Sequence, residues 1–305
     1  MLYTTHFLIL ILPLVCALLA VAFYTLLERK LLGYIMLRKG PNKVGFMGIL
    51  QPFSDAGKLF CKEVVVPRYA NFIPFILCPT FVLGISLTLW VMYPFKNSEL
   101  IFVCGLVQFL VISSMSVYGT MVAGWSSNSK YALLGAVRSV AQSISYEVPM
   151  SFIILCFIYG SSSFMLQEIG MFQHVIMFFF PFFPCCVLWV ICILAETNRA
   201  PFDFVEGESE LVSGFNVEYS GGAFAMIYMA EYSSMLFNSV ISSVLFFGSN
   251  EIFMSIMCMF FVVGFVWVRG TMPRMRYDKL MKLCWTVILC VAMCVACVVM
   301  CYSFL

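Results

Sequence analysis

Two glutamates stand inside long apolar segments of the sequence, and each is next to a tyrosine. Glu147 follows Tyr146 in RSVAQSISYEVPM, and Glu231 precedes Tyr232 in MAEY. On a helical wheel, the polar residues around each glutamate share one face. These residues are Ser139, Gln142, Ser143, Tyr146 and Glu147 in the first segment and Tyr228, Glu231, Tyr232, Asn238, Ser239 and Ser242 in the second. An ionised carboxylate at the centre of a membrane costs about 2.5–3.5 kcal/mol, so the two stripes predict a proton path or hydrogen-bonded contacts between helices.

A second set of acids is concentrated in one connector, AETNRAPFDFVEGESELVSGFNVEYSGG, between Ala195 and Gly222. It holds six of the 15 acidic residues of the chain: Glu196, Asp203, Glu206, Glu208, Glu210 and Glu218. Arg199 is the only basic residue in it. The connector could extend the proton path, or it could form an acidic rim that binds a basic partner.

The elements that must position these acids are membrane-spanning helices. Of the 305 residues, 63% are hydrophobic and 10% are charged, whereas about a quarter of a soluble domain is charged. A helix crosses a bilayer with about 20 apolar residues, and the chain offers eight such runs. They are 2–27, 70–93, 100–123, 139–159, 175–195, 223–247, 252–268 and 283–304. Because these runs are continuously apolar and do not alternate, we predict an all-α, polytopic membrane protein that forms a single membrane domain over residues 1–305.

Basic residues predict the orientation of the helices. Sixteen of the 17 Lys and Arg residues lie in the connectors 28–69, 124–138, 196–222 and 269–282, and Lys96 is the exception. By the positive-inside rule, these connectors face inward and both termini face outward. The first apolar run has no basic residue before Arg29, so we expect it to remain in the mature protein.

The first inward connector contains an amphipathic stretch, QPFSDAGKLFCKE. As a helix, this stretch places Phe53, Ala56 and Phe60 on one side and Asp55, Lys58 and Lys62 on the other. It predicts a short helix that lies along the membrane interface, with a solvated loop as the alternative.

Several chemistries are disfavoured by the sequence. It contains no dinucleotide-binding glycine pattern, phosphate loop, nucleophile elbow or zinc-protease helix. Four of the 14 cysteines share a helix face, namely Cys290, Cys294, Cys297 and Cys301. Spread along about 16 Å of one helix, they cannot surround a single ion, so we predict no metal site. Because the catalytic motifs are missing, we also predict no catalytic residue in this chain.

Six segments of the chain resemble one family. They are LLERKLLGYIMLRKGPNKVG, QPFSDAGKLFCKE, GWSSNSKYALLGAVRSVAQSISYEV, the acidic connector, MAEY and MPRMRYDKLM. They are similar to the signature segments of membrane subunit 1 of the respiratory NADH:quinone oxidoreductase, complex I. The likeness runs from about Leu26 to Met281, and the short chain is most similar to mitochondrially encoded members.

The resemblance implies that the chain is one subunit of a larger enzyme complex. It implies a multi-pass subunit of the mitochondrial inner membrane, with termini toward the intermembrane space. In that family the subunit anchors a peripheral arm, contacts proton-pumping membrane subunits and helps to enclose a tunnel for ubiquinone. NADH, FMN and the iron–sulfur clusters belong to partner subunits, so the chain alone is not expected to be catalytic, and no nucleic-acid partner is expected.

The resemblance also assigns residues to two roles. Residues along the quinone tunnel would be Arg29, Arg38, Asp55, Phe224 and Arg274. Residues of the acidic proton path would be Glu147, Glu196, Asp203, Glu206, Glu208, Glu210 and Glu231. Pro149 departs from the family pattern, in which an ordinary helix-forming residue would follow YEV. The proline removes a hydrogen bond to the carbonyl of Ser145, which predicts a looser helix beside Glu147.

Two other functions remain open. A secondary transporter that exchanges protons for cations would show an internal repeat with paired interrupted helices, and runs 139–159 and 223–247 do not align in this way. A passive membrane anchor for a redox complex would not depend on the charge of Glu231.

Overall fold

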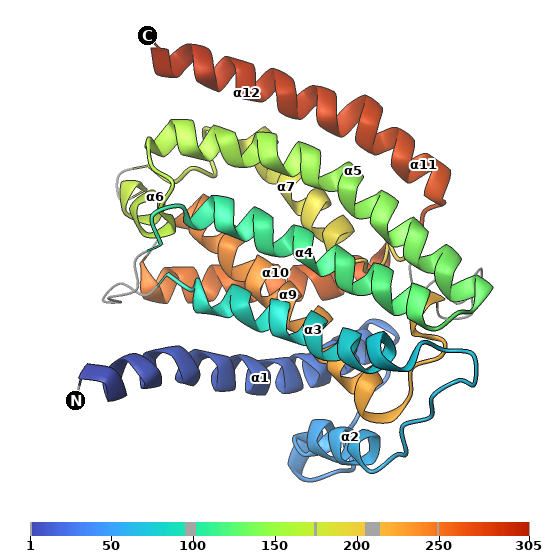
Figure 1. The fold of residues 1–305 in the computed structure, drawn as a ribbon. Coiled ribbons are helices and arrows are strands. Elements are labelled where there is room, and N and C mark those ends of the chain that lie inside the picture. The colour runs from blue at the N-terminus through green and yellow to red at the C-terminus, as the bar shows by residue number, and fades with distance from the viewer. Residues whose placement is uncertain (1, 95–101, 174–175, 205–213, 249, 305) are drawn as a thin grey trace.

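The computed structural model describes residues 2–94, 102–173, 176–204, 214–248 and 250–304, and it shows only helices and loops in them (Figure 1). Within these residues, six helical segments are long and apolar enough to cross a membrane. They belong to α1 (Leu2–Ile35), α3 (Phe72–Val91), α4 (Gly105–Ser126), α5 (Lys130–Ser161), α10 (Glu251–Thr271) and the continuous stretch of α11 (Tyr277–Lys282), η3 (Leu283–Ile288) and α12 (Leu289–Phe304). This confirms the all-helical, polytopic fold class.

Two further helices occupy the places of predicted crossings. The helix α7 (Phe183–Glu196) is apolar but has only 14 residues, because irregular chain precedes it where the run 175–195 predicts a helix. Pro184 lies in its first turn, where proline is well tolerated. The helix α9 (Gly221–Phe247) has 27 residues and lies among α1, α3 and α10. The prediction of eight crossings is therefore confirmed for six segments, and it stays a prediction for α7 and α9.

The helices α1 and α5 extend well beyond the apolar runs that predicted them. The helix α1 continues to Ile35, so Glu28 and Arg29 lie on a helix and not in a connector. The helix α5 begins at Lys130, where the side chain of Ser129 caps it by accepting a hydrogen bond from the Ala132 amide. Apolar runs predict where a helix meets lipid, but the backbone continues helical hydrogen bonding past that point.

Shorter helices lie outside the main bundle. The helix α2 (Gln51–Phe60) follows the turn η1 (Phe46–Gly48) and packs against α1 and α9 at the end away from both termini (Figure 1). Its Phe53 and Phe60 side chains are exposed. The amphipathic stretch is thus a helix, and its position at a membrane interface stays a prediction. The remaining short elements are α6 (Leu166–Phe172) and η2 (Gly214–Asn216).

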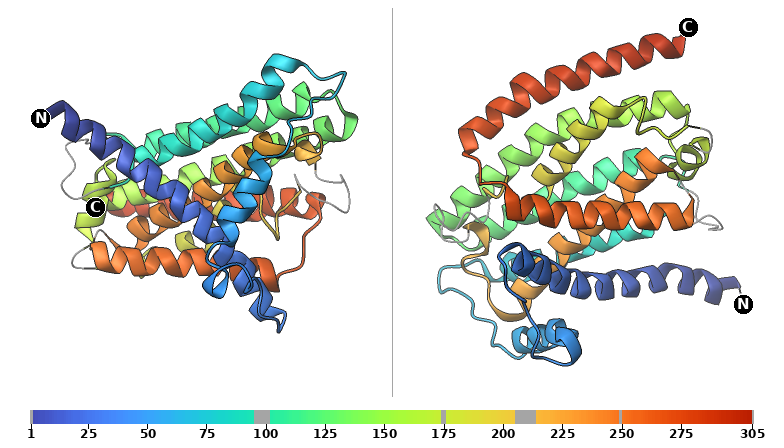
Figure 2. Two further views of the ribbon diagram at one scale, coloured as in Figure 1. Left: turned by 90° about the horizontal axis from the view of Figure 1, so that it is seen from below. Right: turned by 180° about the vertical axis from the view of Figure 1, so that it is seen from behind.

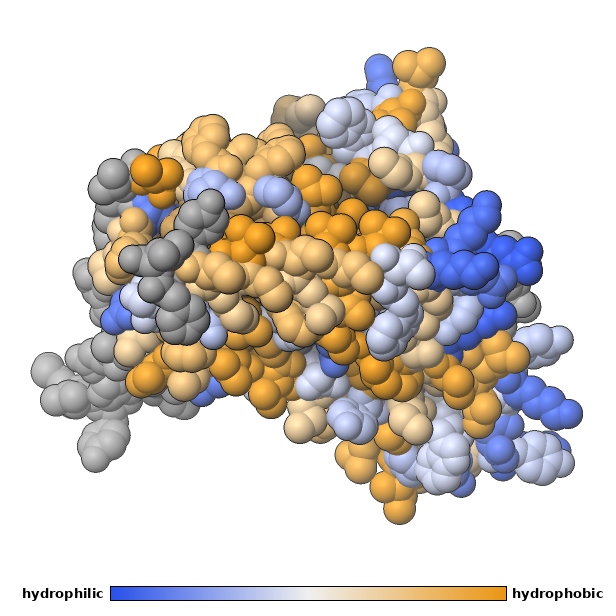
Figure 3. Space-filling view, turned by 90° about the horizontal axis from the view of Figure 1, so that it is seen from above, coloured by the Kyte–Doolittle hydropathy of each residue, from blue (hydrophilic) through white to orange (hydrophobic). Residues whose placement is uncertain are grey.

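The bundle is built around α9. The helices α1, α9 and α10 pack side by side, and α3 and α4 cover another side (Figures 1 and 2). Apolar side chains cover most of the face shown in Figure 3, and hydrophilic ones gather mainly at one end of it. Large apolar side chains point outward over the bundle, including Leu12, Ile73 and Trp267. A bilayer can solvate such a surface, since lipid tails are as apolar as these side chains.

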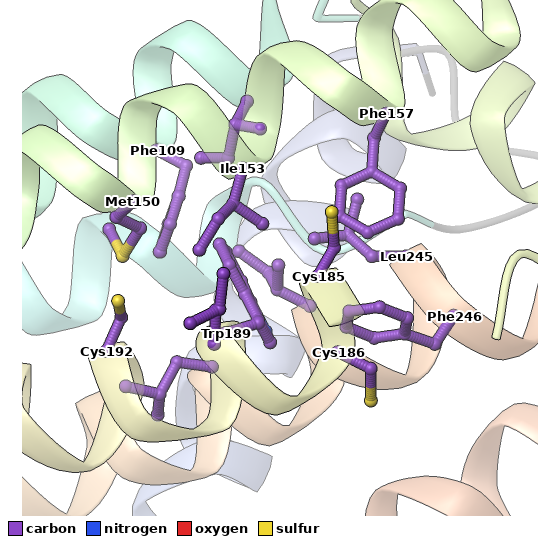
Figure 4. Close-up of a cluster of buried hydrophobic side chains, with 14 of the residues drawn as sticks. Phe109, Met150, Ile153, Phe157, Cys185, Cys186, Trp189, Cys192, Leu245 and Phe246 are labelled. Carbon is purple, nitrogen blue, oxygen red and sulfur yellow. The ribbon is translucent and has the colours of Figure 1, made fainter. Parts of the chain in front are cut away.

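A dense apolar core fills one half of the bundle. Phe109, Ile153, Phe157, Trp189 and Phe246 come from α4, α5, α7 and α9 and are fully buried (Figure 4). The half of α9 nearer its start carries charged and polar side chains instead. The candidate functional site lies there.

Candidate functional site

A buried cluster of charged and aromatic side chains joins α1, α9 and α10. Glu28 of α1 accepts one hydrogen bond from the Tyr232 hydroxyl and another from Arg269, with which it forms an ion pair. The Glu28 side chain is 7% exposed. The hydroxyls of Tyr228 and Tyr232 lie 2.9 Å apart. Since an unpaired buried carboxylate is costly, these partners explain how Glu28 is tolerated among apolar helices.

Arg199 connects this cluster to Glu231. Its guanidinium carbon lies 4.4 Å from the ring centroid of Tyr232 and 5.4 Å from that of Tyr228, which are cation–π distances. Its Nη2 atom lies 3.7 Å from Oε2 of Glu231, an ion-pair contact. Burial works to lower the pKa of Arg199, but Tyr232, Glu231 and Glu28 together raise that pKa well above its ordinary value. Arg199 therefore stays a cation at every physiological pH.

Glu231 and Glu196 line the same small cavity of about 70 Å³. The cavity lies between α3, α4, α9 and the end of α7, and hydroxyls of Ser86, Ser113, Ser116, Thr120 and Ser234 contribute to its wall. Two side-chain amides, Asn198 and Asn238, also line it, and Nδ2 of Asn238 donates to Oε2 of Glu196 at 3.3 Å. A polar cavity of this size has room for a few water molecules, since each needs about 10–15 Å³ of this measure.

The polar face of α5 adjoins this cavity. Glu147 is half-buried and close enough to Glu196 for the two carboxylates to repel each other. The Ser139 and Thr120 hydroxyl oxygens lie 3.4 Å apart and join α5 to the cavity wall on α4. Gln142 donates to the carbonyl oxygens of Ala195 at 2.9 Å and Phe202 at 3.1 Å, which holds the end of α7 against α5.

Pro149 lies inside α5 without interrupting it, and the predicted loosening beside Glu147 stays a prediction. The helix is continuous from Lys130 to Ser161. The carbonyl of Ser145, which loses its helical partner to the proline ring, accepts a hydrogen bond from Sγ of Cys284 at 2.8 Å. Cys284 lies in the π-helical turn η3, so a neighbouring element supplies the donor that the proline lacks.

The predicted tunnel residues fall into separate contacts. Arg29 forms an ion pair with Asp55, which joins α1 to α2. Phe224 stacks on Tyr228 with ring centroids 5.7 Å apart. The guanidinium carbon of Arg274 lies 5.6 Å from the Phe204 ring centroid, and Arg38 is exposed after α1. The structure thus brings Arg29 to Asp55 and Phe224 to the tyrosine cluster, and it does not unite all five residues.

The predicted proton-path residues are partly brought together. Glu196 and Glu231 share the cavity, Glu147 lies beside it, and Asp203 is half-buried in the connector after α7. Glu206, Glu208 and Glu210 lie outside the described residues, so their predicted role is untested.

Sequence reasoning missed Glu28 and Arg269 and did not give Arg199 a partner. The leucines on both sides of Glu28 in LLERKLL could have indicated that the helix continues through the charges. Arg199 is the only cation in the acidic connector, but sequence alone did not show that it turns toward α9. Among the residues that the structure describes, no group of three or more His, Cys, Asp or Glu side chains could hold a metal ion.

This geometry defines a helical membrane protein with a connected set of charged and polar groups buried in its bundle. Residues 8–300 match the profile of the family described as NADH dehydrogenase. NADH-ubiquinone oxidoreductase chain 1 of Mytilus edulis is 62% identical over 284 residues, which cover 92% of each chain. The protein of the same name from Aedes aegypti is 54% identical and covers 89% of this chain and 87% of its own length. That from Tetraodon nigroviridis is 49% identical, with 92% and 90% covered. The chain belongs to the NADH dehydrogenase family.

Proposed function

We propose that the chain is a membrane subunit of an NADH:ubiquinone oxidoreductase and that its buried carboxylates relay protons when ubiquinone is reduced. Membership of the family and the names of its relatives support the first part. The observation that carries the second part is the cavity, with hydroxyls in its wall, that Glu196 and Glu231 share inside the bundle.

The chemistry of quinone reduction explains why such groups are useful. Reduction to the quinol adds two electrons and requires two protons, and a transient quinone anion is costly in a medium of low dielectric constant. Carboxylates nearby can take up or release protons in response, and closely spaced ones titrate as a set. NADH, FMN and iron–sulfur clusters on partner subunits would supply the electrons, and this chain supplies the protonatable groups.

The contacts suggest a route for the response. It begins at the exposed Arg29–Asp55 pair and passes through the neighbouring Glu28 to Arg269 and Tyr232. From Tyr232 it continues through Arg199 to Glu231, which lines the cavity. From the cavity it reaches Glu196 and Glu147. The steps of this row from Arg29 to Glu231 are contacts between side chains or between neighbours along one helix, and the steps among Glu231, Glu196 and Glu147 pass through or beside the cavity. A charge change at one group can bias the next.

The quinone would approach this row from the inward end. In this proposal Arg29, Arg38, Asp55, Phe224 and Arg274 lie along or beside its tunnel. The termini face the intermembrane space, and the inward connectors face the peripheral arm. Crosslinking the assembled enzyme with a photoreactive ubiquinone analogue should label peptides that contain Arg29 or Phe224. Labels confined to partner chains would remove the tunnel assignment.

Glu196→Gln in the assembled complex tests the proton route. Loss of the titratable proton should lower proton translocation by roughly tenfold or more, since a relay carboxylate has no substitute. The matched control is Glu251→Gln, which neutralises an exposed acid at the start of α10. Equal and near-native pumping by both variants would contradict the route.

Two further variants test the alternatives. Native electron flow and pumping after Glu231→Gln would favour a passive anchor. A Glu206→Gln, Glu208→Gln, Glu210→Gln triple variant that pumps normally but binds the arm weakly would favour an acidic rim. Proton or cation flux through the isolated, reconstituted chain would favour a transporter.

A further inference from the structure

Asn238 is a buried amide that forms a hydrogen bond with the carboxylate of Glu196. It lies on α9, is 1% exposed and lines the cavity that also contains Glu196. Its Nδ2 atom donates to Glu196, whereas its Oδ1 atom is buried and has no hydrogen-bond partner among the described residues. Buried polar atoms normally have partners, so this acceptor calls for an explanation.

The backbone of Asn238 is held firmly against α7, the helix that carries Glu196. The Ser242 hydroxyl donates to the Asn238 carbonyl at 2.6 Å, and Nε1 of Trp189 on α7 donates to that hydroxyl at 3.0 Å. Asn238 and Glu196 therefore keep a fixed separation. The terminal torsion of the asparagine stays broad and nearly two-fold, so its amide group can reverse without moving the helix.

We propose that Asn238 is a positioning residue whose amide pairs with the carboxyl group of Glu196 in both of its protonation states; this inference rests on the proposed function of Glu196 as a proton carrier. When Glu196 is ionised, Nδ2 donates to it. When Glu196 is protonated, its hydroxyl donates to Oδ1, after the amide reverses or through a water molecule in the cavity. An amide can serve both states because it carries a donor and an acceptor. Neither state then leaves a buried group unpaired, so the carboxyl group can change charge without a large structural cost.

Asn198 and several hydroxyls that also line the cavity carry a donor and an acceptor, but Asn238 is the one that the structure places in contact with Glu196. The ionisable groups near it are Glu147 from α5, Glu231 from α9, which shares the cavity and pairs with Arg199, and Cys192 from α7. The described residues of α3 and α4 contribute hydroxyls and apolar groups to the cavity. Glu147 repels an ionised Glu196, and Asn238 is the neutral side chain that the structure places in hydrogen-bond contact with it.

The test compares three variants in the assembled complex. Asn238→Leu is similar in size but can neither donate nor accept, so it should lower proton translocation by roughly tenfold. It should also move the pH midpoint of pumping upward by about one unit, because the bond lost by the ionised carboxylate is stronger than the bond lost by the protonated one. Asn238→Thr keeps a donor and an acceptor in one hydroxyl and should stay within about threefold of the native rate. The control is Ser243→Ala on the same helix, because the buried Ser243 hydroxyl donates only to its own helix, at Val240. It should change neither quantity.

Infrared difference spectra provide the second measurement. The carbonyl band of protonated Glu196, identified by its loss in Glu196→Gln, should shift in Asn238→Leu because its hydroxyl loses an acceptor. A shift with altered pumping supports the proposal.

Unchanged bands and pH midpoint in Asn238→Leu, in a complex that Glu196→Gln still inactivates, would overturn the role of Asn238 and leave the proton route intact. If Glu196→Gln itself has no effect, the proposed function fails. If Asn238→Leu does not assemble, the band in Asn238→Thr decides, since it must then remain close to its native position.

Discussion

Two acids of this bundle are balanced by arginines. Glu28 is paired with Arg269, and Glu231 with Arg199, while the rings of Tyr228 and Tyr232 lie between the two pairs. Moving any one of these charges alone into an apolar interior would cost several kcal/mol. Two acids and two cations in one cluster cancel most of that cost. The arrangement keeps carboxylates inside the membrane region without forcing them to be neutral.

Arg199 should be the most sensitive member of this set. Arg199→Met leaves Glu231 without its counter-charge, so we expect the free energy of unfolding to fall by about 3–5 kcal/mol. Arg199→Lys keeps the charge but loses planar stacking on Tyr232, so its loss should be smaller. The amount of assembled complex and its thermal unfolding midpoint measure both effects. Arg276→Met is the control, because Arg276 pairs with Asp278 where both side chains are exposed, at 76% and 64%. Equal losses for Arg199 and Arg276 variants would contradict the buried role.

Tyr219 makes a pH-dependent contribution outside the spanning helices. Burial raises the pKa of its hydroxyl to about 12, although its hydrogen bond to Ser126 acts in the opposite direction. Because the folded-state pKa is above the ordinary value of about 10, this contribution to stability is present below pH 10 and is lost as the pH rises through 12. Tyr219→Phe should retain the stacking on Phe75, whose ring centroid lies 4.3 Å away, and should lose less stability than the native chain above pH 10. Unfolding midpoints between pH 8 and 11 measure this, with the exposed Tyr69→Phe as control.

At the scale of elements, α5 depends on a donor from another helix. Cys284→Ala leaves the Ser145 carbonyl without the thiol, which should cost about 1 kcal/mol. Pro149→Ala restores the backbone donor to that carbonyl, so the same cysteine substitution should cost clearly less in the Pro149→Ala background. A double-mutant cycle of thermal unfolding free energies should therefore give a coupling of about 0.5–1 kcal/mol. A coupling of zero would show that the thiol is not the replacement donor.

The packing of α4 against α5 depends on a small residue. A Cβ atom at Gly124 would lie 2.4 Å from the Cβ of Ala136 and 2.8 Å from the Ala132 carbonyl oxygen, so Gly124→Ala must push the two helices apart. We expect the free energy of unfolding of the Gly124→Ala variant to fall by about 1–3 kcal/mol. Gly84→Ala is the matched control on α3, because nothing lies within 4 Å of its added Cβ. That change should be neutral or stabilising by up to about 1 kcal/mol, since alanine is the better helix former.

The elements were more predictable than the contacts between them. Long apolar runs indicated the spanning helices because lipid requires them, and Glu147, Glu196 and Glu231 stood out because acids are rare in such runs. The ends of α1 and α5 were misjudged, since helical hydrogen bonds continue beyond the apolar residues. The pairing of Arg199 with Glu231 and of Glu28 with Arg269 depends on how helices distant in sequence pack, and a single sequence does not contain that information.

At the scale of the whole molecule, the bundle has two different halves. The charged and polar residues occupy the first part of α9 and the adjoining parts of α1 and α5, whereas the second part of α9 lies in the apolar core around Trp189 and Phe246. Both termini lie at the end of the bundle toward which that core extends (Figure 1). Under the proposed function, protons taken up in the polar half would meet an apolar barrier in the other half. This arrangement suits a subunit that passes its charge changes sideways to neighbouring subunits.

Variants of the Glu28–Arg269 pair test whether the proposed route from Arg29 to Glu147 needs every one of its ionisable groups. Glu28→Met or Arg269→Met alone breaks the pair and should lower the free energy of unfolding. Because Arg269 is partly exposed, we expect the loss to lie near the lower end of about 3–5 kcal/mol. The double variant removes both charges, and apolar side chains of similar size can replace a buried ion pair with little loss of stability. Assembly on native gels should therefore recover in the double variant. Proton translocation per electron should remain low, because the row between Arg29 and Arg199 then lacks its ionisable link. A double variant that assembles and pumps at the native rate would show that Glu28 and Arg269 only hold α1 and α10 together, and that any response to quinone reduction reaches Glu231 by another path.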